Sequence, residues 1–119
     1  MEQRRHSLQA FTLIEVMIVV AIIGLLLTLV IPNLVKSREM SQKNVCIANL
    51  RQLNNAIVVW AFENNHVAGD IIDPDALIGS TNYLRQMPIC PAGGVYLFHA
   101  VQDSPQVSCT FDHLGHVLP

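Results

Sequence analysis

The stretch Phe11–Ile31, FTLIEVMIVVAIIGLLLTLVI, decides the fold of this 119-residue chain. Only three of its side chains carry a polar group: Thr12, Glu15 and Thr28. No proline occurs before Pro32. A helix of this length rises about 1.5 Å per residue and extends about 31 Å, which matches the hydrocarbon core of a bilayer. The sequence therefore predicts a membrane-spanning helix.

Three other interpretations of this stretch fit less well. A cleavable secretory signal has an apolar core of about 7 to 15 residues and a small-residue cleavage site, which Val35–Ser37 matches poorly. A lipoprotein signal requires a cysteine directly after the apolar run, and Cys46 lies too far downstream. A plain signal anchor leaves Glu15 unexplained, because an acidic side chain within hydrocarbon is costly and indicates a partner. The alternative for Glu15 is that its carboxylate reaches the lipid headgroups near the end of the helix.

The residues around Glu15 resemble the processing site of type IV prepilins and type II secretion pseudopilins. In that family a small residue, usually glycine, precedes a phenylalanine, a glutamate follows four positions later, and an apolar run comes next. The segment Ala10–Val16, AFTLIEV, fits this pattern, with Ala10 in place of glycine. Two arginines make the preceding leader basic, and Pro32 stands where the family often places a proline.

The resemblance implies a role for each of these residues. A prepilin peptidase would cut between Ala10 and Phe11 and leave a free α-amine on Phe11, which the family then methylates. An α-amine is mostly protonated at neutral pH, and opposite charges attract strongly where the dielectric constant is low. Glu15 is therefore expected to pair with the Phe11 amine of a neighbouring subunit during filament assembly. Pro32, with Gly24, is expected either to let the span unwind as subunits pack or to leave a slight kink.

The charge distribution excludes one class of partner and does not set the orientation. The net charge is −2 and no basic stripe with interleaved aromatic residues is present, so we expect no nucleic-acid partner. Lys36, Arg38 and Lys43 follow the span and outnumber the leader arginines, so the positive-inside rule does not place the N-terminus in the cytoplasm. The resemblance implies that orientation, with a single pass through the inner membrane and the head in the periplasm.

Beyond Pro32 the helical pattern continues to about residue 64, where Asn64–His66 and Gly69 end it. The apolar stripe of this second half consists of Val45, Ile47, Leu50, Leu53, Ile57, Trp60 and Ala61. We predict an α+β, pilin-like fold in which one long, kinked helix packs on a small antiparallel β-sheet. The predicted segments are a cleaved leader (1–10), a transmembrane and polymerisation helix (11–35), an amphipathic helix (36–65) and a small periplasmic head with a hairpin (66–119).

Three aspartates open the head. Asp73 and Pro74 are typical of a helix start, with Asp73 as the N-terminal cap and Pro74 at the first helical position. Asp70, Asp73 and Asp75 would alternatively bind calcium, as some major pseudopilins do in their heads. Their spacing is not that of an EF-hand.

A hairpin is predicted from residues 95–101 and 107–111, which flank a turn-forming segment. The second of these strands alternates apolar and polar residues, so one of its faces is suited to the core. The predicted register pairs Phe98 with Cys109 and Tyr96 with Phe111.

The state of the cysteines depends on the compartment. If the head lies outside the cytoplasm, a Cys90–Cys109 disulfide is preferred, since Cys46 lies back on the helix; it would add about 3 kcal/mol of stability. Alternatively, Cys90 and Cys109 would join His113 and His116 in a Cys2His2 zinc site, although the cysteines lack the usual close spacing. We otherwise interpret the two histidines as polar turn residues and expect no cofactor.

No catalytic motif is evident: the sequence has no nucleophile elbow, phosphate loop, CxxC pair or His-Glu metal motif, so we do not expect an enzyme. The resemblance implies a structural subunit of a type II secretion pseudopilus that polymerises through its apolar helix. A major or minor type IV pilin of a surface filament is one alternative, and a membrane-anchored Cys/His metal-binding module is another. The implied partners are further copies of the chain, a prepilin peptidase, an inner-membrane assembly platform and the lipid bilayer.

Overall fold

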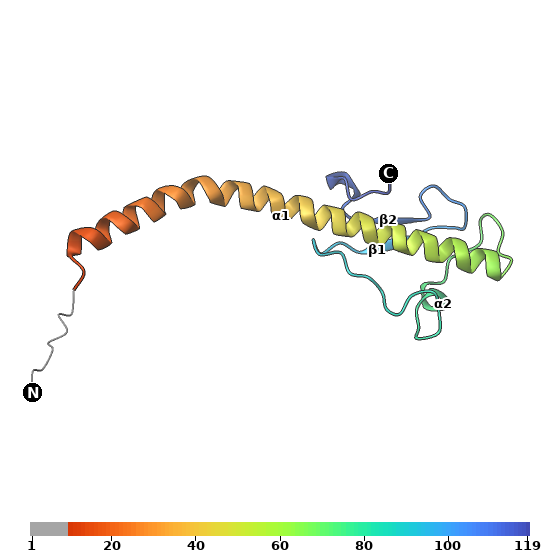
Figure 1. The fold of residues 1–119 in the computed structure, drawn as a ribbon. Coiled ribbons are helices and arrows are strands. Elements are labelled where there is room, and N and C mark those ends of the chain that lie inside the picture. Colours follow the sequence, from red (N-terminus) through yellow and green to blue (C-terminus); the bar gives the residue numbers. More distant parts are fainter. Residues whose placement is uncertain (1–9) are drawn as a thin grey trace, which may run out of the picture. The chain divides into compact units, whose positions relative to one another are not determined.

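The structure is a computed structural model that describes residues 10–119. Nearly all of the predicted leader, residues 1–10, lies outside the described residues. The elements are the helix α1 (Leu13–Glu63), the short helix α2 (Pro74–Leu77), the strands β1 (Tyr96–Phe98) and β2 (Val107–Cys109), and the 3-10 helix η1 (Asp112–Leu114) (Figure 1). The chain divides into two compact units, one that ends at Lys36 and one that covers Ser37–Pro119.

Between Phe11 and Val35, the first unit is apolar on all its sides. Every large apolar side chain from Phe11 to Val35 is at least 50% exposed. Thr28, the polar residue in mid-span, donates from Oγ1 to the Leu25 carbonyl at 2.7 Å and so needs no outside partner. α1 runs through Pro32 without interruption, and in the described part of the chain it is the one helix long and apolar enough to cross a membrane. Such a surface is stable only against lipid or other apolar helices.

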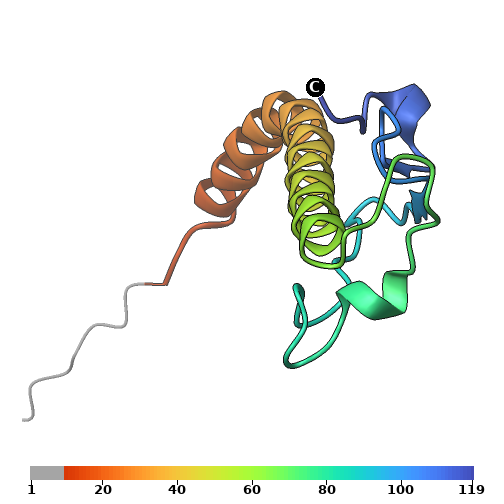
Figure 2. The ribbon, with the colours of Figure 1, turned by 90° about the vertical axis from the view of Figure 1, so that its right-hand side faces the viewer.

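In the second unit, one face of α1 supplies the core. We call this unit, Ser37–Pro119, the head from here on. The rest of the head lies to one side of its part of α1, as Figure 2 shows. The buried side chains of α1 are Cys46, Leu50, Leu53, Ala56, Ile57, Trp60 and Ala61. Most of the predicted stripe is confirmed, but two members are wrong, because Val45 is 45% exposed and Ile47 is only half-buried. The stripe begins instead at Cys46, four positions before Leu50 and therefore on the same face.

The sheet consists of the antiparallel strands β1 and β2, and its pairing corrects the predicted register. The pairs are Tyr96 with Cys109, Leu97 with Ser108 and Phe98 with Val107. The strands are shorter than predicted. The His99 N–H still donates to the Gln106 carbonyl across the hairpin, but the Val101 N–H donates to the Asp70 carbonyl at 2.9 Å. The register differs from the prediction by two residues, and such a shift keeps each side chain on its own face. Val107 and Cys109 are therefore buried, as expected.

The segment between the helices follows its predicted signals. α1 ends at Glu63, and Asn65 then takes the left-handed conformation (φ 54°) that is common just beyond a helix. The Asp73 side chain caps α2 by accepting from the Asp75 N–H at 3.0 Å, and Pro74 is the first helical residue. The predicted helix end and cap are both confirmed.

Candidate functional site

The predicted cleavage junction lies in accessible backbone. Ala10, Phe11 and Thr12 precede the first residue of α1 and have no regular secondary structure. All three are exposed, and the Phe11 side chain is 81% exposed. Because a peptidase must enclose the bond that it cuts, an exposed and non-helical junction is suited to processing. Cleavage at the Ala10–Phe11 bond stays a prediction.

Thr12 and Glu15 form a reciprocal cap at the start of α1. The Glu15 N–H donates to Thr12 Oγ1 at 3.3 Å, and Glu15 Oε2 accepts from the Thr12 N–H at 3.4 Å. This arrangement is a capping box, in which the side chains of Thr12 and Glu15 each accept from the backbone N–H of the other residue, and the Glu15 N–H also donates to the Thr12 carbonyl at 3.1 Å. A Thr-x-x-Glu pattern ahead of an apolar run is its sequence signal, and we did not recognise it from the sequence.

The cap gives Glu15 a local role that needs no second subunit. One of its carboxylate oxygens bonds to Thr12, while the other has lone pairs for a further donor. The positive end of the helix dipole also favours a negative charge at this position. Glu15 can therefore cap its own helix and accept a cation, and these two roles make different demands on its side chain.

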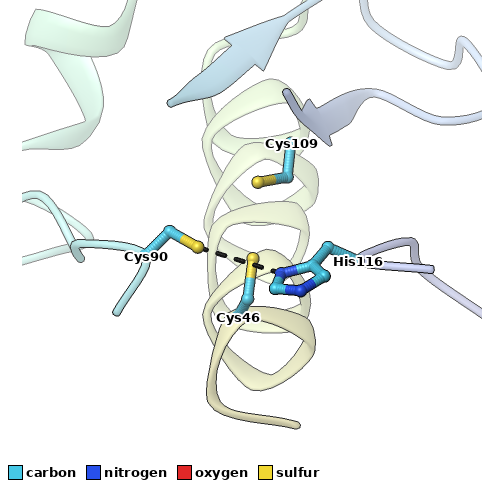
Figure 3. Close-up of side chains that lie close together, drawn as sticks. All are labelled: Cys46, Cys90, Cys109 and His116. Carbon is cyan, nitrogen blue, oxygen red and sulfur yellow. Dashed lines mark hydrogen bonds between the residues drawn. The ribbon is translucent and has the colours of Figure 1, made fainter. Parts of the chain in front are cut away.

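In the head, the structure brings Cys90 and Cys109 together with Cys46 and His116 (Figure 3). One potential ligand atom of each residue lies within 4.8 Å of the others, and all four residues are buried. His113 is exposed on η1 and lies outside this cluster, so Cys46 takes its place in the potential ligand set. The interpretation of His116 as a polar turn residue is wrong, because its side chain is buried. The structure shows three free thiols, and the Cys90–Cys109 disulfide stays a prediction.

The alternative zinc set named three of the four cluster residues and missed Cys46, for which the sequence held a signal. Cys46 lies four positions before Leu50 and seven before Leu53, so helical periodicity places it on the buried face. His116 was named as a potential ligand, but its burial has no comparable signal, because it follows a turn near the end of the chain. Its burial depends on contacts with residues distant in sequence.

Burial shifts proton affinities within the cluster and at its neighbour Tyr96. Burial raises the pKa of the Cys46 thiol to about 12, and the neighbouring Cys90 adds to the rise. It also raises the pKa of Tyr96, whose hydroxyl donates to Cys46 Sγ at 3.7 Å. Burial likewise acts to raise the pKa of Cys90, but hydrogen bonds from the Ala92 N–H and from the adjacent thiols outweigh it and lower the pKa overall. The surroundings therefore favour a thiolate at Cys90 more than at Cys46.

The head aspartates have separate local partners. Asp70 accepts from the Val67 N–H at 2.9 Å and lies 3.0 Å from His66 Nδ1, and these two contacts hold the pKa of Asp70 below its usual range. Asp73 caps α2. Within residues 10–119 the aspartates do not form a group of three ligands that could hold a metal ion. Calcium binding stays a prediction without a ligand set.

The long helix with an exposed apolar start, the accessible junction before it and the small α+β head are the features of a pilin-like protein. Comparison with known proteins shows to which family within this class the chain is similar. Residues 5–31 match the family model of the prokaryotic N-terminal methylation motif. No solved structure matches the chain.

Relatives that match most of the chain identify the family. The chain is 31% identical over 108 residues to the type II secretion system core protein G of Aeromonas hydrophila. The aligned region covers 81% of this chain and 74% of that protein. It is 30% identical over 101 residues to core protein G of Escherichia coli (strain K12), with 75% of this chain and 70% of that protein covered. The chain belongs to the type II secretion system core protein G family. The resemblance to prepilins and pseudopilins is thereby confirmed.

Proposed function

We propose that this chain is a structural subunit of a type II secretion pseudopilus, held in the inner membrane by its apolar segment with the head in the periplasm. The observation that carries the proposal is the exposed apolar surface of residues 11–35, which contains the single carboxylate of Glu15. Lipid covers this surface before assembly, and the same segment of other copies covers it in the filament. In this role the chain is the substrate of a prepilin peptidase and an N-methyltransferase and performs no catalysis.

Processing supplies the charge that Glu15 requires. Before cleavage, the Phe11 nitrogen is part of a neutral peptide bond; after cleavage it is an α-amine that is mostly protonated at neutral pH. An unpaired ion among apolar helices costs several kcal/mol, and a well-placed opposite charge offsets that cost. Glu15 of one subunit therefore favours a neighbour whose leader has been removed. An uncut subunit has no amine to offer at this position.

Two substitutions separate the capping role of Glu15 from its role in ion pairing. Glu15→Gln removes the charge but keeps a side-chain oxygen that can accept from the Thr12 N–H. Thr12→Val removes the hydroxyl of the cap and leaves the charge. In a strain that lacks its own copy of the gene, we expect Glu15→Gln to be processed but to form no pseudopili and to abolish secretion. Thr12→Val should retain both.

Glu39→Gln is the matched control, because Glu39 is an exposed glutamate of α1 beyond the apolar segment. It should behave as the wild type does in processing, cross-linked filament yield and secreted protein. Normal secretion by the Glu15→Gln variant would contradict the ion pair. If Thr12→Val abolished secretion while Glu15→Gln retained it, the role of Glu15 would be capping rather than assembly.

A further inference from the structure

We propose that Cys46, Cys90, Cys109 and His116 form a structural zinc site of the Cys3His type within the head. The residues come from four separate segments: α1, the loop before β1, β2 and the C-terminal segment after η1. Figure 3 shows their side chains pointing toward one another across the core. Their exposed fractions are 0%, 1%, 2% and 4%, respectively. This site does not depend on the proposed role in secretion.

The distances suit a tetrahedral ion. The four potential ligand atoms all lie within 4.8 Å of one another, and Cys90 Sγ is 3.9 Å from His116 Nδ1. A zinc ion with Zn–S bonds of about 2.3 Å holds tetrahedral ligand atoms about 3.8 Å apart. Side-chain adjustments of less than about 1 Å would therefore close the set around zinc.

The number and kind of ligands favour a metal over a disulfide. All three cysteines of the chain are in the cluster, so a disulfide between any two leaves the third thiol and the imidazole of His116 buried beside it. Buried polar groups normally have partners, and one metal ion would engage all four at once. Three sulfurs and one imidazole nitrogen are a ligand set of structural zinc sites, which are closed to solvent.

The surroundings of the cluster position its sulfur atoms. A Cβ atom at Gly94 would lie 2.6 Å from Cys109 Sγ and 3.3 Å from Cys90 Sγ, so the backbone passes against both sulfurs and leaves no room for a side chain. The Tyr96 hydroxyl donates to Cys46 Sγ at 3.7 Å. Hydrogen bonds of this kind orient the ligands of metal sites.

Zinc at this position would join the four segments of a head that has a small core. Small domains commonly depend on a metal or on disulfides, because the apolar area that they bury is limited. Removing the ion should therefore loosen the contacts of β2 and of the C-terminal segment with α1, and lower the midpoint of thermal unfolding.

The experiment uses the full-length protein, purified in detergent without added metal or chelator. We expect one zinc ion per chain by inductively coupled plasma mass spectrometry. Cys46→Ser and His116→Gln should both lose it, whereas His113→Gln, which changes the exposed histidine of the same region, should retain it. Wild-type protein freed of zinc and given Co2+ should show the visible absorption of tetrahedral thiolate-bound cobalt, and added Zn2+ should remove it.

Alkylation before and after chelation distinguishes the metal from the disulfide even if a variant fails to fold. With zinc bound, the three thiols of the wild-type protein should be protected from alkylation. After unfolding in denaturant with chelator, all three should be alkylated without any reductant. Absence of zinc together with only one reactive thiol would overturn the proposal in favour of a disulfide. Zinc retained equally by the folded Cys46→Ser and His116→Gln variants would overturn it as adventitious binding.

Discussion

The two units of the chain differ in how far they bury their apolar side chains. From Phe11 to Val35 in the first unit every large apolar side chain is exposed, whereas in the second unit one face of α1 is buried by the rest of the head. Ile22 and Val58 are nearly equally exposed, at 53% and 51%, yet only Ile22 belongs to a surface that is apolar on all sides. The difference shows that the first unit must obtain its burial from other molecules, while the head obtains most of its burial from its own chain.

A pair of leucine truncations tests this division with the largest expected effect. Leu53→Ala should destabilise the head by about 2–5 kcal/mol, because Leu53 is fully buried in its core. Leu26→Ala removes the same atoms from a side chain that is 56% exposed, and should leave the unfolding of the head unchanged. Urea unfolding in detergent, followed by the fluorescence of Trp60, the single tryptophan, measures both. Equal destabilisation by the two variants would contradict the division.

A pair of lysine substitutions examines what covers the exposed side chains. Ile22→Lys should disfavour membrane insertion by about 2.5–3.5 kcal/mol and reduce the fraction of protein in the membrane, since it places a charge near the middle of the span. Val58→Lys, at similar exposure in the head, should insert normally. Fractionation of cells that express each variant gives the comparison. An equal insertion defect for Val58→Lys would mean that the head also enters the membrane.

A substitution at the cap of α2 tests how much a single hydrogen bond contributes to the stability of the head. Asp73→Ala should lower the stability of the head by about 1 kcal/mol, because the Asp75 N–H loses its acceptor. Asp73→Asn is the matched variant, since asparagine also caps helices well, and its stability should stay close to that of the wild type. Thermal unfolding of both proteins provides the measurement. Equal losses would show that the charge of Asp73, rather than its cap, is what matters.

The smallest expected effect is a pH dependence that originates at Asp70. The Val67 N–H and His66 lower the pKa of Asp70 in the folded chain, so its carboxylate adds stability above the unfolded pKa, about 3.8, and loses it as the pH falls through the folded value. Asp70→Asn should therefore be less stable than the wild type at pH 6, and the difference should shrink below pH 4. Unfolding midpoints across this range test the sign. A difference that grows on acidification would be the contrary result.

Features encoded within a short stretch of sequence were predictable. The apolar run of residues 11–31 predicted the start of α1 because its composition suits only lipid or other apolar helices. The Asp73-Pro74 pair predicted α2 because a cap acts within one turn. Most of the buried stripe also followed from the steps of three and four in the second half of α1.

Features that depend on distant contacts were not predictable in the same way. The register of β1 and β2 differs from the prediction by two residues, and Val101, beyond β1, bonds to Asp70, a residue far away in the sequence. The position of His116 depends on how the C-terminal segment folds back against the helix and the sheet. Three of the four cluster residues were named together from the sequence, but their grouping with Cys46 depends on these long-range contacts.

The measurement that tests the account most directly is the intact mass of the protein extracted from bacterial membranes, with sequencing of its first residues. A chain that begins at Phe11 and carries a methyl group on its α-amine is the predicted result, because Glu15 then has a charged terminus to bind on the adjacent subunit. A chain that retains residues 1–10 would contradict it, since no such terminus would exist.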